Sequence, residues 1–242
     1  MENQKRILVL GAGTVGQAVA KRFLAQSCSV VICDDSKSRL SGATANLPSA
    51  QSLWVADIKC ADHVDVIITQ AVELLGGLDG YIHTVNDYDF IPLEDMRFSQ
   101  WRGLRERCLD AAFVWGQRVG KKMAALNCGG SILYVISDAC ARQDPNDPGR
   151  CATQWGVKGL VRSMAVSLGK YGVTVNAVCP HDLATEEDDQ QRQKLSAYLG
   201  VAAVPKELQA ADEVAELCAF LVWEAVNVSG QALLLSNGTS FN

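Results

Sequence analysis

Three polar side chains stand close behind an apolar segment, at spacings that could place them in one reactive site. Ser137 directly follows the strand-like run Ser131 to Ile136. Arg150 comes thirteen positions later and Gln154 four after that, at the start of a helix-like run. A serine can orient a hydroxyl or a carbonyl, but arginine keeps its proton near neutral pH and glutamine is uncharged. Together these three residues offer no proton relay.

A glycine-rich turn near the N-terminus predicts a nucleotide-binding element. Gly11, Gly13 and Gly16 follow the apolar run Arg6 to Leu10 and precede a helical pattern. Strand, Gly-x-Gly-x-x-Gly and helix in this order form the context that a dinucleotide motif requires. The glycines allow a tight turn, and the helix N-terminus offers free N–H groups to a pyrophosphate. The alternative is a turn that only joins strand to helix, so cofactor binding stays open.

A carboxylate follows the second predicted strand. Ser29 to Cys33 is mostly apolar and leads into Asp34 and Asp35. A carboxylate at this place can accept hydrogen bonds from the adenosine ribose and would repel a 2′-phosphate. If a dinucleotide binds, we expect NAD rather than NADP, with Asp34 as the ribose contact.

Two runs further along the chain carry a family resemblance. Arg162 to Ala165 reads RSMA and Val173 to Val178 reads VTVNAV, and both resemble runs of the short-chain dehydrogenase/reductase family. The resemblance extends from Arg6 to about Gly238. It implies a Rossmann-like, doubly wound parallel sheet of about seven strands, in a single domain that spans residues 1–242. In this family a serine after the fifth strand is followed, at the distance seen here, by Tyr-x-x-x-Lys.

The resemblance also implies that the catalytic set is degenerate. Arg150 stands at the tyrosine position and Gln154 at the lysine position. Cys108 stands where the family usually has an asparagine that completes the proton relay, so Ser137 is the remnant. No tyrosine in the chain has a lysine four residues on, so a shifted alignment does not restore the pair. We therefore predict that the chain alone has no dehydrogenase activity.

The nucleotide half departs from the family pattern as well. The family usually spaces its glycines Gly-x-x-x-Gly-x-Gly, so the turn here is one residue short. The fourth predicted strand, Leu78 to Ile82, is followed by HTVN in place of Asn-Asn-Ala-Gly, and we expect Val85 and Asn86 to crowd the nicotinamide side. Asp57 matches a family aspartate that contacts the adenine amino group, or it caps the following helix.

Hydrophobic periodicity predicts the elements that position these residues. Besides the strands already named, strands are expected at Leu53–Ala56, Val173–Val178 and Gly230–Leu235. Helices are expected at Cys60–Leu75, Phe98–Leu126, Cys151–Lys170 and Asp212–Val222. A turn is expected at Asp144–Gly149 and a polar lid at residues 183–208.

Composition excludes several classes of protein. Hydrophobic residues make up 48% and charged residues 20% of the chain, as in ordinary soluble globular proteins. The net charge of -5 argues against a nucleic-acid binder. No apolar run is long enough for a membrane span, and no signal peptide is expected. The nine cysteines are scattered, which favours free thiols in a reducing cytoplasm and no metal site.

Three functions remain open at this stage. The first is a non-catalytic subunit that supports an active dehydrogenase of the same family. The two would form a hetero-oligomer that we expect to be a tetramer. The complex would be an NAD-dependent alcohol dehydrogenase of the hydroxyacyl-CoA type. The resemblance implies such assembly, because in the family the two long helices pack against a neighbouring subunit. The second is an atypical NAD-dependent oxidoreductase that uses His83, His181 or a carboxylate beside Ser137. The third is a dinucleotide-sensing regulatory protein.

Overall fold

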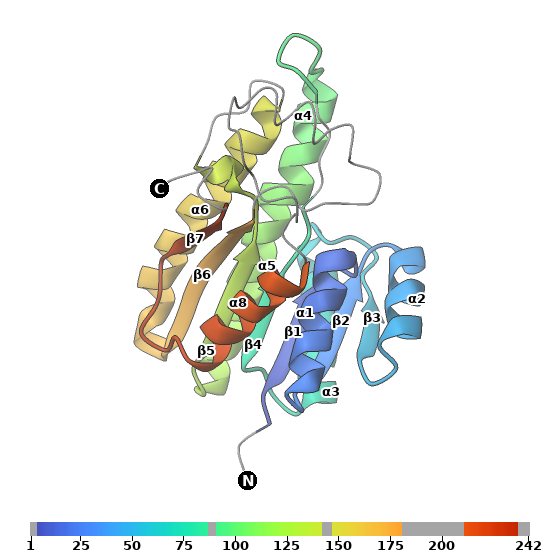
Figure 1. Cartoon of the computed structure of the whole chain (residues 1–242), viewed down its shortest axis with the longest axis vertical. Helices are drawn as coiled ribbons and strands as arrows, with labels where there is room; N and C mark the ends of the chain where they lie inside the picture. Colours follow the sequence, from blue (N-terminus) through green and yellow to red (C-terminus); the bar gives the residue numbers. More distant parts are fainter. Residues whose placement is uncertain (1–3, 87–90, 142–146, 181–210, 237–242) are drawn as a thin grey trace.

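A parallel β-sheet forms the centre of the molecule. The computed structural model describes residues 4–86, 91–141, 147–180 and 211–236, and within them seven parallel strands run in the order β3-β2-β1-β4-β5-β6-β7 (Figure 1). The strands are β1 (Arg6–Leu10), β2 (Ser29–Asp34), β3 (Gln51–Trp54), β4 (Gly80–His83), β5 (Gly130–Val135), β6 (Val173–Pro180) and β7 (Ala232–Leu235). The predicted doubly wound, single-domain α/β fold is confirmed.

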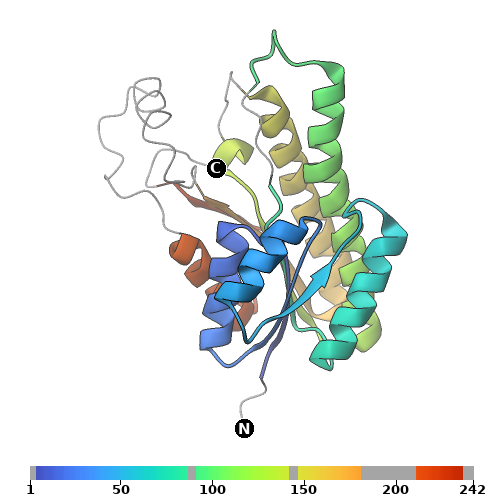
Figure 2. The same cartoon turned by 90° about the vertical axis from the view of Figure 1, so that its right-hand side faces the viewer.

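Helices cover both faces of this sheet. One layer contains α1 (Thr14–Ala25), α2 (Lys37–Asn46) and α8 (Ala211–Trp223), and the other contains α3 (Ala61–Leu75), α5 (Ala111–Leu126) and α6 (Pro148–Leu168). The side view shows the two layers on opposite sides of the strands (Figure 2). Helix α4 (Phe98–Arg105) precedes α5, and short 3₁₀ turns lie at Asp138–Cys140 and Gly169–Tyr171. Because both faces are covered, the central strands are buried over most of their length and are rich in Val, Ile and Leu.

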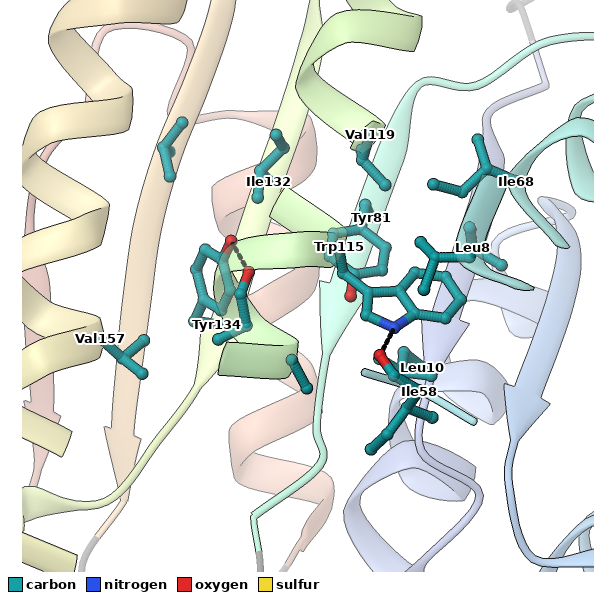
Figure 3. Close-up of a cluster of buried hydrophobic side chains, with 14 of the residues drawn as sticks. Leu8, Leu10, Ile58, Ile68, Tyr81, Trp115, Val119, Ile132, Tyr134 and Val157 are labelled. Atoms are coloured by element: carbon teal, nitrogen blue, oxygen red, sulfur yellow. Dashed lines mark hydrogen bonds between the residues drawn. The ribbon is translucent and has the colours of Figure 1, made fainter. Parts of the chain in front are cut away.

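An aromatic cluster fills the core between the sheet and α5. Trp115 is fully buried, stacks on Tyr81 at 5.9 Å between ring centroids, and donates from Nε1 to the Ile58 carbonyl oxygen at 2.9 Å (Figure 3). Tyr134 donates its hydroxyl to the Ala112 carbonyl oxygen at 3.0 Å. Each buried polar tip thus has a partner, so the rings add apolar area without a desolvation penalty.

Three predicted boundaries are corrected by the structure. Strand β3 begins at Gln51 rather than Leu53, because its backbone pairs with β2 from Val31 onward and the chain leaves the sheet after Trp54. The helix expected from Phe98 to Leu126 is interrupted by a π-helical turn at Glu106–Asp110. Strand β7 begins two residues later than expected, at Ala232.

The start of α6 also differs from its prediction. The sequence suggests a turn through Gly149, but the helix already begins at Pro148. The Asp147 side chain caps it by accepting from the Arg150 N–H at 2.9 Å, and proline is favoured in the first helical turn. This earlier start places the Arg150 side chain on the first turn of the helix.

Two further expectations concern the predicted lid and the absence of a membrane span. The predicted lid, residues 183–208, lies outside them. Among the described helices, none is long and apolar enough to cross a membrane.

Candidate functional site

The site residues gather at one edge of the sheet, where the strand order reverses. After β1 the chain turns to β2 on one side, whereas β4 pairs with β1 on the other. In open α/β sheets, ligands bind in the crevice at the carboxyl ends of strands around such a switch point. The glycine turn follows β1, residues 84–86 follow β4 and Ser137 follows β5. Topology therefore brings together segments that are far apart in the sequence.

The glycine turn has a backbone that requires glycine at two of its three positions. Gly11 has φ +105°, which side chains rarely adopt. A Cβ at Gly16 would collide with the Gly11 carbonyl oxygen, so α1 packs directly on the turn. Gly13 precedes α1 and a Cβ there would meet nothing within 4 Å. The turn therefore leaves open space beside Gly13 and the first N–H groups of α1, and this half of the site fits a pyrophosphate.

Thr84 braces the same turn from the end of β4. Its hydroxyl donates to the Leu10 carbonyl oxygen at 2.9 Å and lies 3.2 Å from that of Gly11. A Cβ on Gly11 would strike this hydroxyl. Thr84 and Gly11 thus depend on each other, which ties the segment after β4 to the glycine turn.

Asp34 holds this turn rather than facing an open crevice. It is buried, and its carboxylate accepts from the Ala12 N–H and the Ser36 N–H, both at 2.7 Å, and from Arg39 Nη2 at 2.8 Å. Burial acts to raise the pKa of Asp34, but the hydrogen bonds from Arg39, Ala12 and Ser36 outweigh it and lower the pKa. The carboxylate is therefore an ionised internal anchor.

This arrangement changes the argument about the cofactor. Asp34 already accepts from three partners, so a ribose hydroxyl would have to displace Arg39 to reach it. The Arg39 charge also offsets the repulsion that Asp34 alone would exert on a 2′-phosphate. The role of Asp34 as a ribose contact remains a prediction, and the preference for NAD over NADP loses its electrostatic basis.

Asp57 lies in a turn between β3 and α3. Its side chain accepts from the Lys59 N–H at 2.8 Å, whereas the residue that caps α3 is Cys60. The alternative in which Asp57 caps that helix is therefore wrong. Its contact with an adenine remains a prediction.

Arg150 occupies the place expected for a proton-transferring tyrosine. Its side chain is 1% exposed, and Nε donates to the Ser137 hydroxyl oxygen at 3.1 Å. The same oxygen accepts from the Ala139 N–H at 3.1 Å. The structure thus brings Ser137 and Arg150 together as the sequence spacing suggests, but the donor that faces the serine is a guanidinium that does not release its proton near neutral pH.

Gln154 joins three parts of the site. Its Oε1 accepts from the Ser137 N–H at 3.0 Å, and its Nε2 donates to Asn86 Oδ1 at 2.9 Å. The amide therefore links α6 to the segments that follow β4 and β5. A lysine could not accept the bond from the Ser137 N–H, because an ammonium has donors but no acceptor. None of the groups that form these hydrogen bonds titrates near neutral pH.

Cys108 lies in the π-helical turn between α4 and α5 and is buried. Such turns widen a helix by one residue and are frequent at functional sites. The sequence carries no signal for this turn, because the apolar positions Leu104, Cys108 and Ala112 recur in steps of four, which suit a regular helix as well as a π-helical turn. The structure therefore keeps an unusual helix at the position where the family places its asparagine, although the side chain is a thiol.

The buried His83 does not face the crevice as a free base. Its Nδ1 is hydrogen-bonded to the Tyr81 hydroxyl at 2.8 Å, within the core. Burial lowers the pKa of His83 to about 3, with the Val85 backbone acting weakly in the opposite direction. This histidine is neutral at physiological pH and belongs to the aromatic cluster around Tyr81. His181, the other candidate base, lies outside the described residues.

The arginines of α4 and of the π-helical turn that follows it do not form a common anion site. Arg107 pairs with Asp35 at 2.8 Å and Arg105 with Asp110 at 3.2 Å, while Arg102 lies over the Phe98 ring at 5.3 Å. Each side chain has its own local partner, as on a solvated helix surface.

Sequence reasoning missed one buried cluster at this edge. Lys158 lies on α6 one turn beyond Gln154, is buried, and donates from Nζ to the Cys140 carbonyl oxygen at 3.3 Å. Cys140 in turn contacts Cys179 at the end of β6. The spacing of Lys158 from Gln154 was visible in the sequence, but the meeting of a cysteine in the turn after β5 with one in β6 was not. Among the described residues, no group of three or more potential metal ligands comes together.

Known proteins share the sequence pattern and the fold of this chain. A family model described as enoyl-(acyl carrier protein) reductase matches residues 11–240. Meso-2,3-butanediol dehydrogenase of Serratia marcescens is 27% identical over 90% of this chain and 87% of its own length. Among solved structures, levodione reductase superposes with a TM-score of 0.87 at 24% identity and covers 97% of both chains.

A reductase of Mycobacterium tuberculosis is also similar. It is named (5R,7aS)-5-hydroxy-7a-methyl-1-oxo-2,3,5,6,7,7a-hexahydro-1H-indene-carboxyl-CoA reductase, and it is 28% identical over 93% of this chain and 91% of its own length. The matched family model spans almost the whole chain, and the fold superposes on that of levodione reductase. The glycine turn and Ser137 both follow strands at the carboxyl edge of the sheet. On this evidence the chain belongs to the short-chain dehydrogenase/reductase family of oxidoreductases.

Proposed function

We propose that this chain is a non-catalytic subunit that supports an active short-chain dehydrogenase. The observation that carries the proposal is the bond from Arg150 Nε to the Ser137 hydroxyl oxygen at 3.1 Å. Oxidation of an alcohol requires a group that accepts the hydroxyl proton while hydride leaves the carbon. At this position the family uses a tyrosine, whereas here a permanently protonated guanidinium faces the serine.

The second substitution acts in the same direction. Gln154 stands where a lysine charge would lower the pKa of a neighbouring tyrosine, and its amide is engaged with Ser137 and Asn86 instead. When bound, a nicotinamide cofactor would supply hydride transfer. The residues of this chain would contribute the pyrophosphate cradle at Gly11, Gly13 and Gly16 but no proton acceptor. The similarity to active dehydrogenases therefore concerns the scaffold. The residues at positions 150 and 154 support the proposal that the chain has no group to accept the hydroxyl proton.

The partner surface that we propose lies on the outer faces of α5 and α6. Phe113 on α5 is 46% exposed, and Trp155 and Val166 on α6 are 52% and 85% exposed. Aromatic residues exposed on a helix surface are enriched at protein interfaces. The partner would be a family member with an intact Tyr-x-x-x-Lys, in a hetero-oligomer that we expect to be a tetramer in the cytoplasm.

Two resemblances support the substrate class that we propose for the complex. The chain resembles the inactive subunit of 2-[hydroxy(phenyl)methyl]succinyl-CoA dehydrogenase, an enzyme of anaerobic toluene degradation. One relative is named as a carboxyl-CoA reductase. We therefore propose that the active partner oxidises a hydroxyacyl-CoA thioester with NAD. CoA thioesters of this kind are the substrates to test on the assembled complex.

Reconstitution tests this function. The tagged chain is purified from its native cells, a co-purifying family member is identified by mass spectrometry, and the two subunits are then expressed separately and mixed. We expect a fixed stoichiometry by analytical ultracentrifugation, and NADH production by the complex with hydroxyacyl-CoA substrates. A homo-oligomer that oxidises a substrate on its own would contradict the proposal.

Matched variants locate the interface. Trp155→Ser and Val166→Asp should weaken the complex, because they remove exposed apolar area or place a charge in a buried contact. Phe220 is a suitable control, since it is 50% exposed but lies on α8 in the opposite layer. Phe220→Ser should leave the subunit affinity unchanged. Equal effects of all three changes would argue against this surface.

The open space beside Gly13 favours a second candidate, a dinucleotide-binding regulatory protein. Titration of the isolated chain with NAD, NADH, NADP and NADPH distinguishes it from the support subunit. Binding without turnover, abolished by Gly13→Val, would support it. The substitution should leave the fold intact, because a Cβ at Gly13 meets no atom within 4 Å. Gly16→Val is expected to unfold the turn itself and serves as the contrast.

A further inference from the structure

Two cysteines from different elements meet at the edge of the sheet that carries the candidate site. Cys140 ends the 3₁₀ turn that begins directly after Ser137, and Cys179 is the next-to-last residue of β6. The neighbouring strands fix their approach, since the Ile136 N–H donates to the Val178 carbonyl oxygen at 3.0 Å. Both cysteine side chains are fully buried in the same core cluster, where they interact with each other.

The surroundings make the two thiols chemically unequal. The hydrogen bond from Cys179 lowers the pKa of Cys140, burial opposes this shift, and the Lys158 ammonium adds to the lowering while Asp138 counteracts it. The pKa of Cys179 is raised well above its usual value by its hydrogen bond with Cys140 and by burial. Cys140 is thus the thiol of the pair that loses its proton more readily.

Other buried cysteines of the chain behave differently. Burial raises the pKa of Cys28 to about 11 and that of Cys218 to about 12. Burial likewise raises the pKa of Cys33 well above its usual value. Because the thiolate is the reactive form of cysteine, these thiols are inert by comparison. Lys158, held at the Cys140 carbonyl oxygen, distinguishes the Cys140 environment from theirs.

We propose that Cys140 and Cys179 form a redox site that a hydroperoxide converts to a reversible disulfide. The Cys140 thiolate attacks one peroxide oxygen, the O–O bond breaks, and Cys140 becomes a sulfenic acid while hydroxide leaves. The Cys179 sulfur then attacks the sulfenic sulfur, the S–O bond breaks, and the oxygen leaves as water with the Cys179 proton. Each sulfur loses one electron overall, and the peroxide gains two. A dithiol reverses the step by thiol–disulfide exchange.

The disulfide would join the turn after Ser137 to the end of β6. These segments flank the site in which Arg150 holds the Ser137 hydroxyl, so the cross-link would rigidify one wall of that site. Disulfides in reducing compartments are usually transient and redox-sensing, which suits a reversible bond in this chain. The inference goes beyond the supporting role proposed above, and its test does not require a partner subunit.

Peptide mapping of the full chain tests the site. The purified protein is treated with a few equivalents of hydrogen peroxide, remaining thiols are blocked with N-ethylmaleimide, and the protein is digested without reductant for mass spectrometry. We expect the peptides of Cys140 and Cys179 to be the main linked pair, and dithiothreitol to release them. Exposed Cys128 reports that the oxidant and the blocking agent reached the protein.

Variants add a quantitative criterion. Lys158→Met keeps the side-chain volume and removes the charge, and it should slow formation of the linked pair by up to about tenfold, the effect of one pKa unit on the thiolate fraction. Cys33→Ser, at a buried thiol on β2, should leave the rate unchanged. The proposal is overturned if Cys140 and Cys179 stay reduced while Cys128 is oxidised, if either is overoxidised without a link, or if Cys140 links mainly to another cysteine. These outcomes are read on the wild-type chain and do not depend on the folding of a variant.

Discussion

The Arg150 guanidinium donates through Nε to the Ser137 hydroxyl oxygen across 3.1 Å, and both side chains are buried. The serine that orients substrate in active family members is therefore held by a group that cannot take up a proton. This relationship, rather than the loss of a single residue, defines the site and makes its repair difficult.

Restoring the family residues should not restore activity. In the double variant Arg150→Tyr with Gln154→Lys, the Ser137 N–H loses its acceptor on α6, while Cys108 and Thr84 keep their present places. We expect no NADH oxidation above background with carbonyl substrates, measured at 340 nm. Measurable turnover by this variant would refute the argument that several positions block the reaction together.

Gln154 should matter for stability, because its amide bridges the segments that follow β4 and β5. Gln154→Ala leaves the buried Ser137 N–H without its acceptor, which costs about 1–3 kcal/mol. Urea denaturation followed by circular dichroism would show this loss in the free energy of unfolding. Gln70, which is exposed on α3, provides the control, because Gln70→Ala should change the free energy of unfolding by less than about 0.5 kcal/mol. Equal stabilities of the two variants would contradict the bridging role of Gln154.

His83 should make the protein less stable in mild acid. Its pKa in the folded chain is lowered to about 3 by burial, so between pH 6.5 and pH 3 the unfolded chain binds a proton that the folded chain does not. Stability from this group is complete above about pH 6.5 and falls as the pH drops, by at most about 1.4 kcal/mol per pH unit for one proton. Denaturation at a series of pH values measures this slope.

The matched variants for this test are His83→Gln and His63→Gln. The first should flatten the pH dependence, whatever its effect on stability at neutral pH. The second changes an exposed histidine on α3 and should leave the slope as in the wild type. A wild-type slope that survives His83→Gln would assign the acid sensitivity to other groups.

Two tryptophans should have opposite roles. Trp115 is fully buried, stacks on Tyr81 and bonds to the Ile58 carbonyl oxygen, so Trp115→Ala should cost about 3–5 kcal/mol. Trp155 is 52% exposed, and Trp155→Ala should cost the isolated chain less than about 1 kcal/mol. Chemical denaturation of the isolated chain compares the two. A large loss with Trp155→Ala would show that its ring supports the fold rather than a partner surface.

The parallel sheet was predictable because its signals are local. A short apolar run such as Arg6–Leu10, followed directly by glycines, favours a buried strand, and the glycine turn has the spacing that a strand-to-helix crossover requires. The interval between Ser137 and Arg150 likewise anticipated their meeting. Strand ends were less certain, as β3 shows, because its first residues join the sheet through backbone bonds to β2 that side-chain patterns do not reveal.

The partners of each polar group depended on tertiary structure. Asp34 looked like a free ribose acceptor, but Arg39 folds back over it, and the sequence separation of the two is compatible with several conformations. Cys140 and Cys179 are 39 positions apart, and only the pairing of β5 with β6 brings them together. Residue types along the chain thus predicted the scaffold, which the structure confirms, and the absence of a proton relay, which remains a prediction. Because hydrogen bonds and pKa values depend on distances between segments remote in sequence, the bridge through Gln154 and the thiol pair became visible only in the folded molecule.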